Sequence, residues 1–113
     1  MVLKPVHWLG SSRAVMRGLP PDARLQAGYE LYRVQLGREP RHWKPMKSVG
    51  PGAVEIRVDA DRAYRIFYVA RYPEAVYVLH VFEKKSRKTS GIDLESGRAR
   101  YREMIRLRRE GGP

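Results

Sequence analysis

The sequence predicts an α+β fold in which helices cover a twisted, mainly antiparallel sheet. Three apolar segments follow one another between residues 53 and 82, and each has the alternating or continuous apolar pattern of a strand. Helical periodicity precedes these segments and returns after residue 90. Since the chain has 113 residues, we expect a single domain that spans positions 1–113.

The N-terminal residues predict a strand and then a short helix. Residues 2–9 are rich in apolar side chains and are interrupted by Pro5, which places the strand near a sheet edge. Ser11 or Ser12 can cap a helix that ends near Leu19.

A longer helix is predicted from Pro20 to Leu36. Proline loses no needed donor in the first turn of a helix, and Asp22 meets the positive end of the helix dipole there. Apolar side chains then recur every three to four residues as one helix face. These side chains are Leu25, Tyr29, Tyr32 and Leu36. We expect the two helices to form an antiparallel hairpin on one face of the sheet.

Four strands are predicted after a connection rich in proline and glycine. A short strand is expected at 46–49, followed by a turn at 50–52. Residues 53–59 alternate cleanly, 63–70 carry side chains on two distinct faces, and 75–82 are apolar on both faces, which suits a covered central strand. The short polar turns between the last three predict an antiparallel meander.

The last predicted element is a helix that begins at Ser90. Asp93 makes a near capping box with this serine, with aspartate in place of the usual glutamate. Leu94, Tyr101 and Ile105 form a narrow apolar stripe along the helix. The predicted order of elements is therefore β-α-α-β-β-β-β-α.

The charge balance indicates a polyanionic partner. Lysine and arginine total 23 against 12 aspartate and glutamate, which gives a formal net charge of +11 and a pI of about 10.4. This balance is typical of nucleic-acid-binding domains, because self-repulsion disfavours the compact state unless a partner offsets it. A basic surface without a specific partner is the alternative.

The composition also narrows the chemistry. The chain has no cysteine, which excludes disulfides, cysteine-based zinc sites and a thiol nucleophile. No metal-ligand spacing and no glycine-rich phosphate loop is present, so we expect neither a metal nor another cofactor. No apolar run approaches the length of a membrane helix, and no signal peptide is recognisable, so we expect a cytoplasmic protein without membrane contact.

Cations on the predicted strands define the candidate catalytic group. Arg57 lies on the polar face of one meander strand, Arg65 lies in the next, and Lys84 and Lys85 end the third. Because neighbouring strands lie about 4.8 Å apart, these side chains can converge if register and facing agree. Such a group suits the phosphodiester of RNA, where cations stabilise the charge that grows on the phosphate oxygens as the 2′-OH attacks. A lysine packed among other cations can also transfer a proton near neutral pH.

Arg65 is the most informative of these residues. A charged side chain between Tyr64 and Ile66 in a central strand is costly unless it is paired or hydrated. An ion pair with Glu55 or Glu83 is the alternative to an anion site at this position.

Further residues are predicted to contact RNA. Tyr68 and Phe82 could stack on bases, and His80 could edge the cleft as a proton acceptor, although a protein core is the commoner place for each. Flanking RNA or ribosomal RNA would be held by Lys47, Arg87 and Lys88.

A resemblance to a known family rests on five segments in order. They are VHWLGSS, WKPMKSVGPGAVEIRV, YRIFYVA, VYVLHVFEKKSRKTS and ARYREM. The most specific part is the succession of EIR, YRIFY and LHVFEKK with a helix after it. On these residues the chain resembles the RelE/ParE superfamily of toxins from type II toxin–antitoxin systems, most closely its HigB-like, phage-derived branch.

The resemblance implies a RelE-like fold and a ribosome-dependent endoribonuclease that cleaves mRNA in the A site without a metal and so inhibits translation. It also implies a helix-turn-helix antitoxin, HigA/XRE-like, that neutralises the toxin in a hetero-oligomeric complex and represses the operon. Two alternatives stay open, a ParE-like inhibitor of DNA gyrase on the same fold and a non-catalytic nucleic-acid-binding module.

Carried over residue by residue, Arg57 matches a basic strand position of the family and Arg65 matches the arginine that holds the phosphate. Lys85 stands where well-known members carry a second arginine, with Lys84 beside it. Lysine at this position replaces the bidentate guanidinium group of arginine by a single point charge. The tyrosine that some members place shortly after this pair has no match here, since Ser90 lies in that region.

Overall fold

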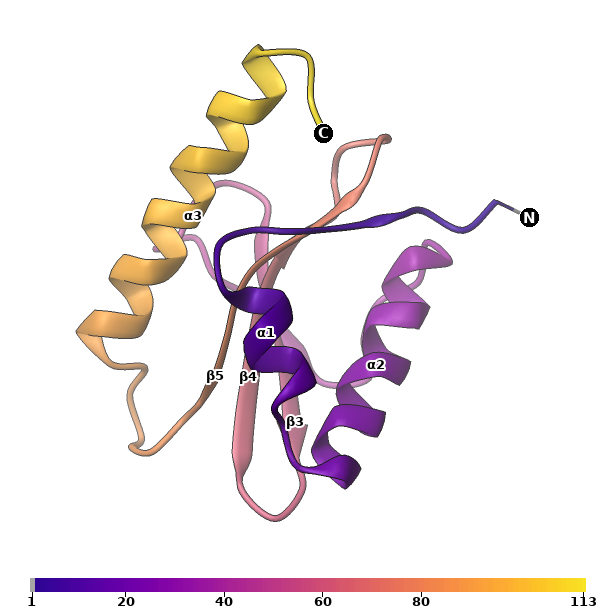
Figure 1. The fold of residues 1–113 in the computed structure, drawn as a ribbon. Coiled ribbons are helices and arrows are strands. Elements are labelled where there is room, and N and C mark those ends of the chain that lie inside the picture. The colour runs from indigo at the N-terminus through magenta and orange to yellow at the C-terminus, as the bar shows by residue number, and fades with distance from the viewer. Residues whose placement is uncertain (1) are drawn as a thin grey trace.

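The computed structural model describes residues 2–113 and has the predicted α+β architecture, a five-stranded sheet with helices on both faces (Figure 1). In chain order the elements are β1 (Val6–Trp8), α1 (Ser12–Arg17), α2 (Pro21–Gln35), β2 (Trp43–Pro45), β3 (Ala53–Asp59), β4 (Ala63–Val69), β5 (Val76–Glu83) and α3 (Gly91–Arg109). Their order agrees with the prediction. Within residues 2–113, no helix combines the length and the apolar character needed to cross a membrane.

The sheet has the strand order β1-β5-β4-β3-β2. Strands β3, β4 and β5 form the predicted antiparallel meander, and β2 pairs antiparallel with β3. β1 lies at an edge, as Pro5 predicts, and pairs parallel with β5 so that Val6 is opposite Val76. The backbone N–H of Val76 donates to the carbonyl of Pro5 at 2.9 Å. Because proline has no N–H, it contributes to the pairing of β1 with β5 only as a hydrogen-bond acceptor.

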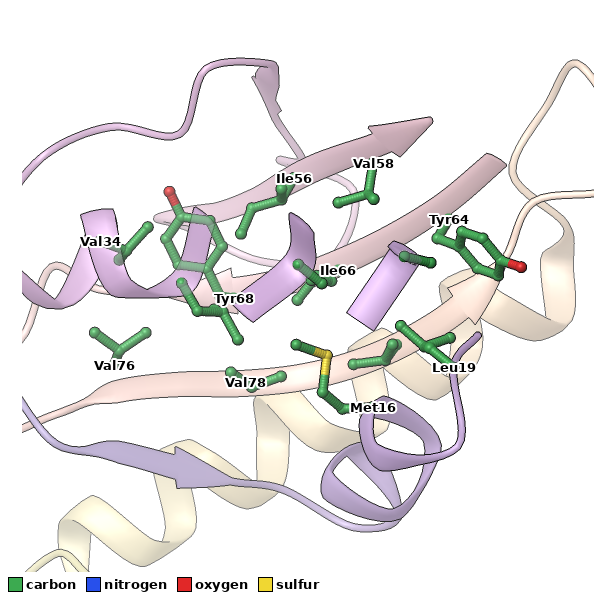
Figure 2. Close-up of a cluster of buried hydrophobic side chains, with 14 residues drawn as sticks. Met16, Leu19, Val34, Ile56, Val58, Tyr64, Ile66, Tyr68, Val76 and Val78 are labelled. Carbon is green, nitrogen blue, oxygen red and sulfur yellow. The ribbon is translucent and has the colours of Figure 1, made fainter. Parts of the chain in front are cut away.

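Each face of the central strands has its own hydrophobic core. Under α1 and α2, Ile56, Ile66 and Val78 of three adjacent strands belong to one cluster (Figure 2). On the other face, α3 covers a second cluster that includes Phe67 and Leu79. β5 is therefore buried on both sides, as its continuous apolar sequence predicts.

The outward face of α2 corrects the sequence analysis. Leu25 is 76% exposed, Tyr29 is 47% exposed and Tyr32 is 48% exposed, so the apolar stripe of this helix does not pack on the sheet. The buried side chains of α2 are instead Ala23, Ala27, Glu30, Leu31 and Val34. The exposed apolar side chains and the buried ones both recur at helical spacing. The buried alanines allow α2 to approach the sheet more closely than the larger side chains would.

The short strand predicted at 46–49 is wrong. β2 lies just before it, and the segment turns back on itself, with the N–H of Val49 bonded to the carbonyl of Met46 at 3.0 Å. Both side chains are buried in the core under α3, which explains the apolar character that suggested a strand. Pro45 is tolerated in β2 because an edge strand needs backbone hydrogen bonds on one side only.

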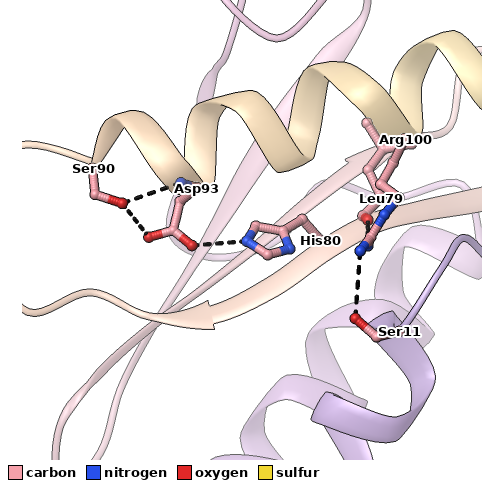
Figure 3. A network of polar contacts seen from close by, with 6 residues as sticks. All are labelled: Ser11, Leu79, His80, Ser90, Asp93 and Arg100. Atoms are coloured by element: carbon pink, nitrogen blue, oxygen red, sulfur yellow. Dashed lines mark hydrogen bonds and ion pairs between the residues drawn. The ribbon is translucent and has the colours of Figure 1, made fainter.

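Polar contacts at the helix starts also connect the layers. The hydroxyl of Ser90 accepts a hydrogen bond from the N–H of Asp93 at 3.1 Å and caps α3 as predicted. Ser11 is the N-cap residue of α1, but its side chain makes no capping bond. Its hydroxyl lies 3.4 Å from Nη2 of Arg100, whose Nη1 donates to the carbonyl of Leu79 at 3.1 Å (Figure 3). Arg100 thus ties α3 to β5 and to the start of α1.

Glu74 connects the C-terminal part of α3 to the sheet. Its carboxylate accepts hydrogen bonds from Nε of Arg108 at 2.6 Å and from the hydroxyl of Tyr77 at 2.5 Å. The bond from Arg108 is the main cause that lowers the pKa of Glu74 to about 2. A carboxyl whose pKa falls on folding stabilises the native state above its ordinary pKa, and this stabilisation is lost as the pH falls toward the lowered value.

We expect Glu74→Gln to lower the free energy of unfolding by about 1 kcal/mol at neutral pH, because a charge-assisted bond between partly exposed partners is weakened by water. The deficit should shrink as the pH falls from 4.5 toward 2. Urea unfolding of the wild type and the variant at several pH values measures it. A deficit that does not change with pH would contradict this assignment.

Close packing of α3 on β4 depends on Gly97. A Cβ at this position would lie 2.8 Å from Cδ2 of Phe67, a ring that is fully buried. We expect Gly97→Ala to destabilise the protein by about 1–3 kcal/mol through overpacking. Gly91→Ala is the matched control, since a Cβ there meets nothing within 4 Å and stability should change by less than about 0.5 kcal/mol. Equal urea midpoints for the two variants would contradict the close contact.

Candidate active site

The register of the meander brings two arginines together. Arg57 of β3 and Arg65 of β4 are direct cross-strand partners, and Arg65 is in turn opposite Phe82 of β5. Beyond the end of β5, the backbone N–H of Lys84 donates to the carbonyl of Ala63 at 2.8 Å, which keeps the lysine beside β4. Cations from three adjacent strand segments therefore lie on one sheet face, and we call Arg57, Arg65 and Lys84 the cation group.

A buried carboxylate lies within this group. In the next row across the sheet, Glu55 of β3 is opposite Lys44 of β2 and Phe67 of β4. The Glu55 side chain is 0% exposed, and neither of its oxygens has a hydrogen-bond partner within the described chain. Its Oε1 lies 3.5 Å from Nε of Arg57 and 3.8 Å from Nε of Arg65. The two guanidinium groups therefore balance the negative charge of the Glu55 carboxylate, although neither forms a hydrogen bond with it.

Arg65 is held rigidly by its own surroundings. The residue is 7% exposed, and its Nη1 donates to the carbonyl of Tyr64 at 2.8 Å and lies 3.3 Å from Oδ1 of Asp59. The ion pair with Glu55 that was considered as an alternative is therefore present, whereas Glu83 pairs with Arg62. The Arg57 side chain is 41% exposed and is the more accessible of the two.

Lys84 differs from an ordinary surface lysine. Burial lowers the pKa of its ammonium group, and the charges of Arg65, Lys44 and Arg57 lower it further against the opposing charge of Glu55. A lowered pKa brings a lysine closer to the range in which it exchanges protons near neutral pH. This group therefore combines positive charge with one lysine whose pKa is lowered.

The second predicted lysine, Lys85, borders a small pocket instead. This pocket has a volume of about 140 Å³ and lies between the end of β5 and the first turn of α3. Its lining residues are Glu83, Lys84, Lys85, Ser86, Lys88, Ser90 and Asp93. Lys84 is thus shared between the cation group and this pocket, and Lys85 follows it along the chain at the pocket.

His80 of β5 is oriented by the first turn of α3 (Figure 3). Its Nε2 lies 2.8 Å from Oδ1 of Asp93, and Oδ2 of the same carboxylate accepts a hydrogen bond from Ser90 at 2.7 Å. The imidazole also stacks on Phe82, with ring centroids 5.0 Å apart. A carboxylate bonded to one ring nitrogen sets the orientation and tautomer of a histidine, which is the arrangement used for proton acceptance at the other nitrogen.

Two functional candidates escaped the sequence analysis. Asp93 has the spacing of a capping residue, and this role accounts for it without any partner on β5. Glu55 was considered only as a pair for Arg65, although its row position between Lys44 and Phe67 puts it inside the cation group. The contact of Asp93 with His80 and the position of Glu55 among the cations both depend on which side chains lie on the same face of the sheet. Neither therefore leaves a signal in local sequence spacing.

The aromatic residues predicted to stack on RNA lie on different faces. Tyr68 is 5% exposed in the core under α1 and α2, so the prediction that it stacks on a base beside the cation group is wrong. Its alternation with Phe67 along β4 turns it to the opposite face. Phe82 is on the correct face but is 6% exposed, and its ring supports His80.

The remaining predicted cations lie at two ends of the sheet. Lys47 is exposed in the turn after β2, near the start of β3, whereas Lys84 lies near the end where β3 finishes. Arg87 and Lys88 are exposed in the loop between β5 and α3. Within residues 2–113, no three histidine, aspartate or glutamate side chains are grouped so that they could hold a metal ion.

Comparison with known families identifies the class of protein to which this domain belongs. A family model described as phage derived protein Gp49-like (DUF891) matches residues 14–102. This range is most of the chain and contains the segments EIR, YRIFY and LHVFEKK, so the chain belongs to this phage-derived, RelE/toxin-like family. No curated protein matches the chain.

The buried pair between Glu55 and Arg65 leads to a stability prediction. We expect Arg65→Met to lower the free energy of unfolding by about 3–5 kcal/mol, because it removes a partner from a buried carboxylate. Adding Glu55→Met should restore much of this loss, since the uncompensated charge is then gone. Urea unfolding measures all three proteins.

The control for this pair is Arg62→Met, which removes a surface partner of Glu83 that is 67% exposed. That change should cost less than about 1 kcal/mol. A double variant less stable than Arg65→Met alone would show that the buried pair is not coupled as described.

Proposed function

We propose that this protein is the toxin of a type II toxin–antitoxin system in the HigB-like branch and acts as a ribosome-dependent mRNA endoribonuclease. Membership of the phage-derived, RelE/toxin-like family supports a toxin with an antitoxin partner. The observation that carries the nuclease proposal is the cation group, in which Arg57, Arg65 and Lys84 share one face around the buried Glu55. A rigid basic surface of this kind is suited to one phosphodiester and not to scattered anions.

The proposed reaction is cleavage by an internal nucleophile. The 2′-hydroxyl attacks the adjacent phosphorus and loses its proton to a base on the protein. The bond from phosphorus to the 5′-oxygen breaks, and the leaving oxygen takes a proton from an acid. The products are a 2′,3′-cyclic phosphate and a free 5′-hydroxyl, and the step needs no external oxidant or metal.

Each side chain of the cation group has a role in this scheme. Arg57, the more exposed arginine, binds the phosphate, and Arg65 supplies a fixed charge beside it, so negative charge in the transition state meets preorganised cations. Lys84, with its lowered pKa, transfers a proton. Lys85 adds charge at the pocket beside it, and His80, oriented by Asp93, is the second candidate for proton transfer.

Ribosome and mRNA are the proposed targets in the cytoplasm, and a helix-turn-helix antitoxin is the proposed partner. The exposed cations at the two ends of the sheet would bind the flanking RNA backbone in a salt-dependent manner. These residues are Lys47, Arg87 and Lys88. Mutation of any one of them should weaken binding without removing the chemistry.

We expect Arg57→Ala and Lys84→Ala each to reduce mRNA cleavage about 100-fold or more and to relieve growth arrest, because each removes a charge that acts in the transition state. Both positions avoid the buried Arg65, whose loss would also destabilise the protein. Induction in bacteria, followed by mapping of transcript ends, measures cleavage. Arg102→Ala on the far, exposed side of α3 is the control that removes an equal charge.

The outcomes of this experiment separate the proposed function from its alternatives. Full toxicity in a folded Arg57→Ala/Lys84→Ala double variant would remove the site assignment. Growth arrest with intact transcripts and DNA damage would favour a gyrase inhibitor. Absence of any growth effect, with salt-dependent binding to duplexes, would favour a non-catalytic nucleic-acid-binding module.

A further inference from the structure

A basic pocket lies at the end of the sheet away from the cation group. It has a volume of about 270 Å³ and is formed by the N-terminal segment, the end of α2, the turn between β2 and β3, and the end of β4. Its charged lining consists of three cations, Lys4, Arg38 and Arg71, against one carboxylate, that of Glu39. Positive charge is therefore in excess in this pocket, and such an excess attracts anions.

The hydroxyl of Tyr68 indicates that this pocket has a ligand. Tyr68 is 5% exposed and its ring lies in the core under α1 and α2, with the hydroxyl directed away from Val78 (Figure 2). A buried phenol normally finds a hydrogen-bond partner, as Tyr64 of the same strand does with Asp61 at 3.1 Å. Within residues 2–113 the hydroxyl of Tyr68 has no such partner, although the residue lines the pocket. Burial raises the pKa of Tyr68, so its hydroxyl stays protonated and can donate to an anion.

Lys4 and Arg71 are positioned at the pocket by contacts within the chain. Nζ of Lys4 donates to the carbonyl of Ala70 at 2.6 Å, and the backbone N–H of Lys4 donates to the carbonyl of Gln35 at 3.1 Å. Arg71 lies against Gly52, where a Cβ would collide with the arginine side chain. Both cations therefore have a defined place in the wall of the pocket.

Neither ion pairing nor helix capping accounts for the cations of this pocket. In the part of the chain that the structure describes, Lys4, Arg38 and Arg71 form no ion pair. The last carbonyls of α2 already accept backbone hydrogen bonds, as that of Val34 does from the N–H of Gly37 at 2.9 Å, so the helix end needs no cation. Burial also lowers the pKa of the Lys4 ammonium group, and a bound anion would offset this cost.

We propose that this pocket is a binding site for a phosphate group. The Tyr68 hydroxyl donates to one phosphate oxygen, and Lys4, Arg38 and Arg71 supply the compensating charge, since guanidinium groups match the geometry of phosphate. These donors come from three separate segments of the chain, which suits the tetrahedral oxygens of phosphate better than a planar carboxylate. Free phosphate and the backbone of RNA present the same oxygens, so both are sources of this group.

The pocket is separate from the cation group. Tyr68 is opposite Val54, which lies three residues along β3 from Arg57, a distance of about 10 Å at roughly 3.3 Å per residue. The ring of Tyr68 lies on the face of the sheet that α2 covers, whereas Arg57 and Glu55 lie on the other face. The phosphate site therefore goes beyond the proposed nuclease function and does not depend on it.

Tyr68→Phe removes the hydroxyl and keeps the ring. We expect it to weaken binding of inorganic phosphate about tenfold, because a hydrogen bond to a charged group is lost. Stability in phosphate-free buffer should not fall, since this hydroxyl has no partner within residues 2–113. Tyr64→Phe is the matched control, which removes a bonded hydroxyl from the same strand and should leave phosphate affinity unchanged. Arg71→Ala should also weaken binding, whereas Arg102→Ala, with an equal loss of charge, should not.

Titration of the full chain with inorganic phosphate at constant ionic strength, followed by amide NMR spectra, measures affinity and location together. The Arg57→Ala/Lys84→Ala background reduces binding at the cation group and permits expression. The amide signals of Gly37 and Gly52, which line the pocket, should shift with phosphate. Absence of a shift at both glycines, or equal phosphate affinity in Tyr68→Phe and its parent, would overturn the proposal.

An RNA oligonucleotide with 2′-O-methyl groups distinguishes the two sources of the phosphate, since it lacks the nucleophile for cleavage. Weaker RNA binding by Tyr68→Phe than by its parent would assign the pocket to the RNA backbone. Equal RNA binding, together with weaker binding of inorganic phosphate, would assign it to free phosphate. If the wild type cleaves no transcript, the nuclease proposal fails, whereas the phosphate affinities still decide the pocket.

Discussion

The buried carboxylate of Glu55 is the constraint on which the basic face depends. Within residues 2–113 its oxygens have no hydrogen-bond partner, and guanidinium groups 3.5 and 3.8 Å away balance its charge. Such a charge fixes the side chains that compensate it, because each loses more by moving than a surface arginine would. Arg57 and Arg65 are therefore positioned beside one carboxylate on two adjacent strands. Like-charge repulsion between them is reduced by the same carboxylate, which lets a strongly basic chain concentrate cations on one surface.

The two faces of the sheet differ in what covers them. α3 packs on one face with Gly97 against Phe67 and leaves the row of Arg57 and Arg65 outside its first turn, where Asp93 orients His80. On the other face, α2 buries small side chains against the sheet and turns its larger apolar ones outward. A full hydrophobic core therefore separates the exposed side chains of α2 from the cation group.

Comparison of particular residues shows which inferences a pattern supports. The meander and the edge position of β1 followed from alternation, short turns and Pro5, because backbone constraints act locally. That Arg57 and Arg65 are direct cross-strand partners was decided by the register of β3 and β4, which the sequence did not fix. Tyr68 was predicted to stack on a base, although its alternation with Arg65 already placed it on the opposite face of β4. Alternation along a strand tells which side chains share a face of the sheet. It does not tell which parts of that face remain uncovered, since that depends on where the covering helices end.

By itself, the sequence determined the class of fold, the order of its elements, the excess of positive charge and the strands that carry the key cations. These depend on local periodicity and composition. Only the tertiary structure decided that α2 buries its alanines and exposes Leu25, and that Glu55 lies among the cations. Asp93 likewise became a partner of His80 only through packing of α3 on β5. The reason is physical, since side chains distant in sequence meet only after helices and strands have chosen which of their faces to bury.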